Sequence, residues 1–115
     1  GRGYLISIHG NAGKGTGFEV FTSPGETKSD KMATLMCKEI MRMFPEIAFR
    51  ADHSDGDPDK EAPFYVLTKT RCPAMLTENG FFDRKKDVKK MIKPAFQKKV
   101  AEAHFNAILR IEREL

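Results

Sequence analysis

The chain has 115 residues, of which 40% are hydrophobic and 31% are charged, so it is long enough for one core and too short for two. It contains no run of about eighteen apolar residues and no signal-type segment, which argues against a membrane-spanning protein. The net charge of +4 is small for so charged a chain, and Cys37 and Cys72 are too few for a secreted disulfide framework. Composition therefore predicts one globular domain over residues 1–115 with two buried thiols.

Strand and helix patterns alternate along the chain. Short runs of strand formers end at glycine or proline, and longer stretches repeat apolar residues at helical spacing. In chain order, the predicted elements are strands Tyr4–Ile8 and Phe18–Thr22, a helix over Lys28–Phe44, a charged loop over Ala51–Pro63, strands Phe64–Leu67 and Ala74–Thr77, a helix over Asp83–Ile92, and a helix from Pro94 onward. This order predicts an α/β fold with a mostly parallel sheet flanked by helices, in which ligands gather at the carboxyl ends of strands.

The glycine-rich stretch over residues 7–17 follows the first predicted strand and raises the possibility of a phosphate loop. A Walker loop needs a glycine five positions before Gly13 and a hydroxyl after Lys14. The sequence has Ile8 and Gly15 at those positions, and no helix pattern follows to receive an anion. A metal site is the better hypothesis for this stretch.

Two polar residues stand at the ends of predicted apolar strands. His9 follows the first strand, where a neutral imidazole could bind zinc, although hydrogen-bonded packing is the simpler role for one histidine. Glu78 follows the strand that ends at Thr77, where a carboxylate is costly unless it is paired or exposed at a site. A salt bridge or a helix cap is the structural alternative for Glu78.

Other candidate ligands carry weaker signals. His53 lies in the charged loop, where histidines are usually solvated, and His104 borders the apolar stripe of the last helix and is expected to pack there. Residues Asp55–Asp59 have the spacing of a calcium loop, but Pro58 intrudes and the twelfth position is Val66 instead of glutamate. Calcium is therefore not predicted.

Two motifs in a fixed order connect the chain to a known family. Residues 7–12 (SIHGNA) and 17–21 (GFEVF) resemble the Ser-Ile-His-x-Asn-Ala and Gly-x-Glu-Val segments of zinc-dependent N-acetylmuramoyl-L-alanine amidases. Residues 65–67 (YVL) and 72–82 (CPAMLTENGFF) are similar to that family's Val-Leu and Pro-Ala-Val-Leu-x-Glu-x-Gly-Phe ending. With a helix between the motifs and a helix after them, the resemblance extends over nearly the whole chain.

The resemblance implies a function and a set of site residues. It implies that His9 is a zinc ligand and that Glu78 is catalytic, moving a proton while zinc-activated water cleaves the amide between N-acetylmuramic acid and L-alanine. Asn11 and Asn79 are expected to line the substrate cleft, with turn stabilisation as the alternative role of each. Peptidoglycan would be the partner, and the location would be the cell envelope, the exterior, or a phage lysin.

The family's other zinc ligands, a histidine and a glutamate, come earlier in its domain than the motif that His9 matches. Only eight residues precede His9, so the resemblance implies the carboxyl-terminal part of an amidase domain with an incomplete zinc site. Without the earlier part, one edge of the sheet would be uncovered, which predicts self-association.

Two other classes of function compete with the amidase. A non-catalytic wall-binding or interaction module could keep this fold after losing the metal site. A cysteine hydrolase is disfavoured because Pro73 follows Cys72 and no helix start activates the thiol. The lysines between Lys85 and Lys99 are not interleaved with aromatic residues on one face, so we expect a solvated helical surface and no nucleic-acid partner.

Overall fold

A computed structural model describes residues 3–12, 16–23, 28–46, 60–61 and 64–115. Its strands are β1 (Leu5–Asn11), β2 (Phe18–Thr22), β3 (Lys60–Glu61) and β4 (Ala74–Phe81), and its helices are α1 (Lys28–Met43), α2 (Tyr65–Thr68), α3 (Lys85–Met91) and α4 (Pro94–Glu114). None of the described helices is both long and apolar enough to cross a membrane. His53 and the calcium-like spacing at Asp55–Asp59 fall outside the described residues.

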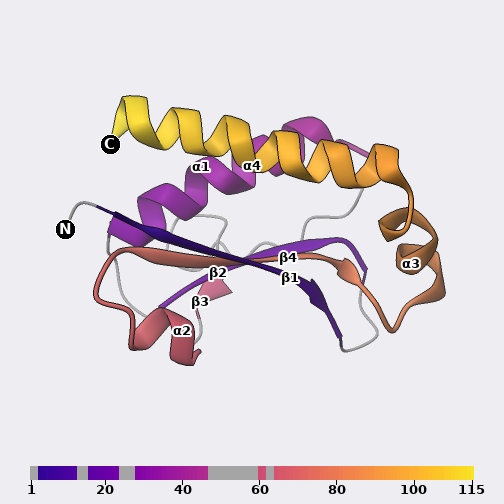
Figure 1. The fold of residues 1–115 in the computed structure, drawn as a ribbon, viewed down its shortest axis with the longest axis horizontal. Helices are drawn as coiled ribbons and strands as arrows, with labels where there is room; N and C mark the ends of the chain where they lie inside the picture. The colour runs from indigo at the N-terminus through magenta and orange to yellow at the C-terminus, as the bar shows by residue number, and fades with distance from the viewer. Residues whose placement is uncertain (1–2, 13–15, 24–27, 47–59, 62–63) are drawn as a thin grey trace.

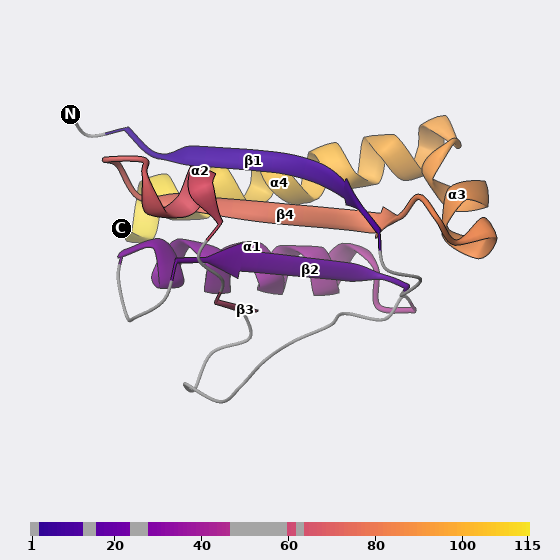
Figure 2. The ribbon, with the colours of Figure 1, turned by 90° about the horizontal axis from the view of Figure 1, so that it is seen from below.

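The strands form one sheet in the order β1-β4-β2-β3 (Figure 2). β4 runs parallel to β1 and antiparallel to β2, and β2 pairs in parallel with the two residues of β3. The α/β class is confirmed, but the sheet is mixed where a mostly parallel one was expected. The antiparallel neighbour of the central strand is β2, the strand that follows β1 in sequence.

The two faces of the sheet are covered differently (Figure 1). Helices α1 and α4 lie against one face, and the short helix α2 lies against the other. On the α1/α4 face, the rings of Phe18 and Phe44 lie in the main core with their centroids 4.9 Å apart, and the partly buried ring of Phe96 packs against both. On the α2 face, a smaller core contains Leu67 and Leu76. Side chains of each strand alternate between these two environments.

The long helices agree with the sequence prediction. α1 begins at the predicted residue, and Met32, Met36 and Ile40 are buried along its inner side. α4 begins at Pro94, which suits the first turn because its missing amide would have no helical partner. The predicted helix over Asp83–Ile92 is confirmed as α3, which is shorter at both ends because Arg84 is its N-cap and Ile92 its C-cap.

The predicted strand over Phe64–Leu67 is wrong, because these residues begin helix α2. The amide of Thr68 donates to the carbonyl of Phe64 at 2.9 Å, as in a helical turn. Within this turn Leu67 is buried, whereas Phe64 and Tyr65 are exposed. A run of four apolar residues has no periodicity that separates a strand from a single helical turn.

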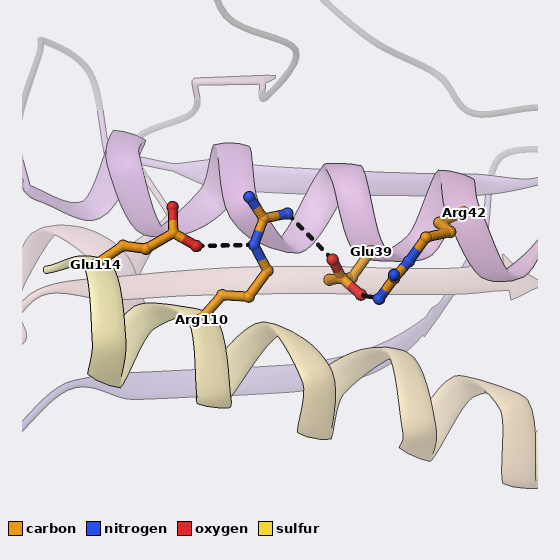
Figure 3. Close-up of polar contacts among 4 residues, drawn as sticks. All are labelled: Glu39, Arg42, Arg110 and Glu114. Carbon is orange, nitrogen blue, oxygen red and sulfur yellow. Dashed lines mark hydrogen bonds and ion pairs between the residues drawn. The ribbon is translucent and has the colours of Figure 1, made fainter.

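An ion network joins α1 to α4 (Figure 3). Glu39 of α1 is only 2% exposed and accepts hydrogen bonds from Arg42 and, at 3.0 Å, from Nη1 of Arg110. Arg110 also bonds Glu114 at 2.9 Å. The buried carboxylate is thus neutralised from both helices, which a buried charge requires.

We expect the Arg110→Met variant to lose about 1.5–3 kcal/mol of unfolding free energy, the usual contribution of a hydrogen bond to a charged group, because Glu39 keeps its charge but loses its interhelical partner. Urea denaturation measures this loss. Arg113→Met, at an exposed position of the same helix, is the matched control and should change stability by less than about 0.5 kcal/mol. Equal stability of the two variants would contradict a stabilising role for the network.

Candidate active site

His9 and Glu78 are neighbours on adjacent strands. His9 of β1 pairs with Glu78 of β4 in the parallel register, so the two side chains point to the same face of the sheet. Alternation along β4 puts Glu78 on the face of Leu76, which is the α2 face. Each residue was expected just beyond the end of its strand. Both strands are longer than predicted, so His9 and Glu78 lie within them.

A second carboxylate completes a row across three strands. Glu19 of β2 pairs with Glu78 from the other side, so His9, Glu78 and Glu19 form a row that we call the site row. Glu19 is buried, and its Oε1 accepts a hydrogen bond of 2.8 Å from Nδ2 of Asn11. The predicted residue Asn11 is therefore joined to the site row through Glu19.

The surroundings of Glu78 favour its protonated form. Burial raises the pKa of Glu78, the nearby imidazole of His9 opposes this change, and the carboxylate of Glu19 adds to it. Oε2 of Glu78 is buried and has no hydrogen-bond partner among the described residues. A carboxyl group with a raised pKa and an oxygen that has no partner among the described residues is suited to exchange a proton with a bound water or substrate.

His9 is exposed at the open end of the row. A hydrogen bond of 2.7 Å joins its Nε2 to the hydroxyl of Ser7, two residues earlier on the same face of β1. A metal bound through Nε2 would have to displace this hydroxyl. The imidazole is accessible to a ligand, as its predicted role requires.

Asn79 lies on the opposite face of β4 from Glu78. Its Nδ2 donates to the carbonyl of His9 at 3.2 Å and to the hydroxyl of Thr77 at 3.1 Å. The structure therefore does not bring this side chain into the site row, and its substrate-binding role stays a prediction. Its contacts are those of a residue that braces β4 against β1.

His104 is a packed residue, as its sequence position indicated. Its Nδ1 bonds the carbonyl of Val100 at 2.7 Å, and its Nε2 bonds the hydroxyl of Thr77 at 2.9 Å. Burial lowers the pKa of His104, which keeps the ring neutral. Both ring nitrogens are therefore engaged: Nδ1 within α4, and Nε2 in holding α4 on β4.

Asp87 of α3 fixes the strand ends beside the site row. Its Oδ2 accepts hydrogen bonds from the amides of Gly17 at 3.1 Å and Phe81 at 2.9 Å, and its Oδ1 accepts one from the hydroxyl of Thr16. Burial alone would raise the pKa of Asp87, but these hydrogen bonds and the charge of Lys90 outweigh it and lower the pKa. One ionised carboxylate thus ties α3 to both β2 and β4.

Gly80 permits the close approach of α3. Its φ of 89° lies in the left-handed region that favours glycine, and a Cβ there would stand 2.8 Å from the sulfur of Met91. A side chain at this position would push α3 away from the end of β4.

The described residues do not complete a zinc site. Among them, no group of three His, Cys, Asp or Glu side chains is arranged to hold a metal ion. Catalytic zinc usually has three protein ligands, and the site row offers His9 as its single imidazole. The residues present therefore do not fit the whole metal centre that the resemblance implies.

Comparison with known proteins shows the family to which this chain belongs. The Amidase_3 family model, described as N-acetylmuramoyl-L-alanine amidase, matches residues 2–110. This chain belongs to that amidase family. The match includes every member of the site row as well as Asp87, so the geometry above is that of part of an amidase fold.

Individual relatives are similar over most of this chain but are longer. The N-acetylmuramoyl-L-alanine amidase CwlM of Bacillus licheniformis is 39% identical over 96% of this chain and 41% of its own length. The endolysin of Bacillus phage SPP1 is 30% identical over 93% of this chain and 39% of its own. The crystal structure of an N-acetylmuramoyl-L-alanine amidase from Clostridium difficile 630 aligns with a TM-score of 0.85 at 27% identity, covering 96% of this chain and 58% of that one. The chain thus spans about two fifths of the length of these two curated relatives.

Sequence reasoning assigned no role to Glu19 and missed the contacts of Asp87. Glu19 carries the same signal that drew attention to Glu78, a carboxylate within an otherwise apolar strand pattern. Asp87 stands in a lysine-rich segment and gave no comparable signal.

Proposed function

We propose that this amidase-family chain acts in hydrolysis of the amide that joins the lactyl group of N-acetylmuramic acid to L-alanine in peptidoglycan. The observation that carries the proposal is Glu78, which stands beside the imidazole of His9 with a raised pKa and with an Oε2 that has no hydrogen-bond partner in the described part of the chain. The family match and the amidase names of the relatives support the choice of substrate.

The proposed reaction uses Glu78 to move one proton. The ionised carboxylate takes a proton from water as the water oxygen bonds to the amide carbon, and it returns that proton to the nitrogen as the C–N bond breaks. The products are a carboxylate on the lactyl group and a free α-amine on L-alanine. We propose that His9 is one ligand of a zinc site whose further ligands are not among the described residues.

A second candidate function is a wall-binding or interaction module without catalysis. The observation in its favour is that no three-ligand metal group occurs in the described part of the chain. Such a module would keep the amidase fold and bind peptidoglycan without cleaving it.

An amidase would produce new amino-terminal alanine on peptidoglycan, whereas a binding module would not. Purified sacculi would be incubated with the chain in the presence of zinc, and new amino-terminal alanine would be labelled and counted. The amidase predicts that alanine amines increase with time and that Glu78→Gln abolishes the increase. Binding to sacculi with no new amines would overturn the amidase and support the module.

The proposed site of action is the cell envelope or the exterior, either in a wall amidase or in a phage lysin.

Self-association is also proposed, since β1 is an edge strand of the described sheet and Ile8 on it is 59% exposed. Sedimentation velocity should show a dimer that dissociates on dilution. A monomer at all concentrations would contradict this part of the proposal.

A further inference from the structure

Basic residues are concentrated in one segment of the chain. Residues 84–99 contain eight of the 20 basic residues and one of the 16 acidic residues, so the segment carries +7 and the rest of the chain carries −3. The single acidic residue is Asp87, which is buried and accepts a hydrogen bond from the amide of Phe81. The small net charge of the whole chain therefore conceals a strong separation of charge.

One side of helix α3 packs on the strand ends, and the other side is exposed. Asp87 and Met91 face the strand ends, where Asp87 bonds Phe81 and Met91 meets Gly80. Lys85, Lys86 and Lys89 are exposed on the other side of the helix, and Lys90 is half-buried beside Asp87. They continue into α4, and we call the following set the lysine patch: Lys85, Lys86, Lys89, Lys90, Lys93, Lys98 and Lys99.

The patch surrounds a groove between α1, α3 and α4. Lys90, Lys93 and Lys99 line it, the rings of Phe44 and Phe96 form its floor, and Glu46 is its one acidic lining residue. Nζ of Lys99 lies 5.6 Å from the centroid of the Phe44 ring. Cationic side chains thus line a groove that also contains two aromatic rings. Helix α3 and the start of α4 lie at the end of the molecule where β1 and β4 terminate (Figure 1).

The start of α4 carries positive charge that does not stabilise this helix. The first turn of α4 contains no acidic residue, and its N-cap Lys93 makes no capping side-chain hydrogen bond. Positive charges near the positive end of a helix dipole repel it, and lysines close together repel one another. A bound polyanion would relieve both repulsions.

We infer that the lysine patch binds a phosphodiester-linked anionic polymer of the cell wall and so holds the molecule on the wall. Lysine is a flexible point charge that suits phosphates repeated along a chain, whereas planar carboxylate recognition favours arginine, of which segment 84–99 has one. The choice of wall polymer rests on the proposed peptidoglycan function.

The test compares two variants with the same net charge. The patch variant replaces four exposed residues with glutamine: Lys85, Lys86, Lys89 and Lys93. The control variant makes the same change at four exposed lysines elsewhere: Lys28, Lys31, Lys38 and Lys69. Thermal melting followed by circular dichroism verifies that each variant folds, and binding is measured at several salt concentrations.

The probes are wall sacculi that retain their phosphodiester polymer, the same sacculi after hydrofluoric acid removes it, and duplex DNA of matched phosphate content. We expect the patch variant to bind untreated sacculi at least about tenfold more weakly, with the slope of log affinity against log salt reduced by about 3. The control variant should bind like the parent, and treated sacculi should bind the parent weakly.

Three results would overturn the inference: equal weakening in both variants, full binding to treated sacculi, or tighter binding to DNA than to sacculi. Amidase activity is scored separately by new alanine amines. Polymer binding without new amines would contradict the proposed hydrolysis alone, and hydrolysis with unaltered binding by the patch variant would contradict the inference alone.

Discussion

Replacing Glu78 with glutamine is expected to lower the rate of amide hydrolysis by about 10²- to 10⁴-fold, the usual contribution of general acid–base catalysis. Glutamine has nearly the same shape but cannot accept the proton of the attacking water. The parent rate should also fall as the pH drops through the raised pKa of Glu78, with an acidic limb above the ordinary value of 4.5. Release of alanine amines measured across pH gives both results.

The stability of Glu78→Gln separates loss of chemistry from loss of structure. Because the folded state raises the pKa of Glu78, this group stabilises the fold below its ordinary pKa, and that contribution is lost as the pH rises through the raised value. Glutamine does not ionise, so the variant avoids this loss of stability. Its melting temperature at pH 7 should therefore be no lower than that of the parent. Glu102→Gln, exposed on α4, is the control and should keep full activity. Activity of Glu78→Gln within threefold of the parent would contradict the catalytic role.

Replacing Asp87 with alanine should reduce the free energy of unfolding by about 3 kcal/mol. Hydrogen bonds to a charged group are worth about 1.5–3 kcal/mol, and this change leaves the amides of Gly17 and Phe81 without their acceptor. Urea denaturation at pH 7 measures the loss. Glu102→Ala, at an exposed helical position, is the control and should cost less than about 0.5 kcal/mol.

The Asp87 effect should depend on pH in a definite direction. The folded state lowers the pKa of Asp87, so its stabilisation is present above the ordinary pKa of 3.8 and is lost as the pH falls through the lowered value. The stability difference between the parent and Asp87→Asn should therefore shrink below about pH 4. A difference that is constant from pH 3 to pH 7 would show that the carboxylate charge is not what holds α3 in place.

The parts of the fold that follow from the sequence are those set by local periodicity. The apolar stripes of α1 and α4 repeat over four or more turns, and Pro94 marks the start of α4, so both helices are predictable. The two strands that hold His9 and Glu78 are also predicted, although each continues further than expected. Glycine at residues 10 and 80 suggested turns, whereas both residues lie inside strands next to Met91.

The parts that could not be predicted depend on pairing between distant segments. The antiparallel register of β2 with β4 puts Glu19 beside Glu78, and nothing within Phe18–Thr22 specifies that partner. The acceptor role of Asp87 toward Gly17 joins residues 70 positions apart. The sequence therefore predicts the individual residues of the site better than their arrangement.

The proposed amide hydrolysis is tested with N-acetylmuramoyl-L-alanyl-D-isoglutamine in ¹⁸O-labelled water with zinc present, followed by mass spectrometry of both products. We expect one ¹⁸O atom in the new carboxyl of N-acetylmuramic acid, none in the released dipeptide, and no product with Glu78→Gln. An intact substrate, or label in a peptide carboxyl group, would contradict the claim that Glu78 and its neighbours serve this amide hydrolysis.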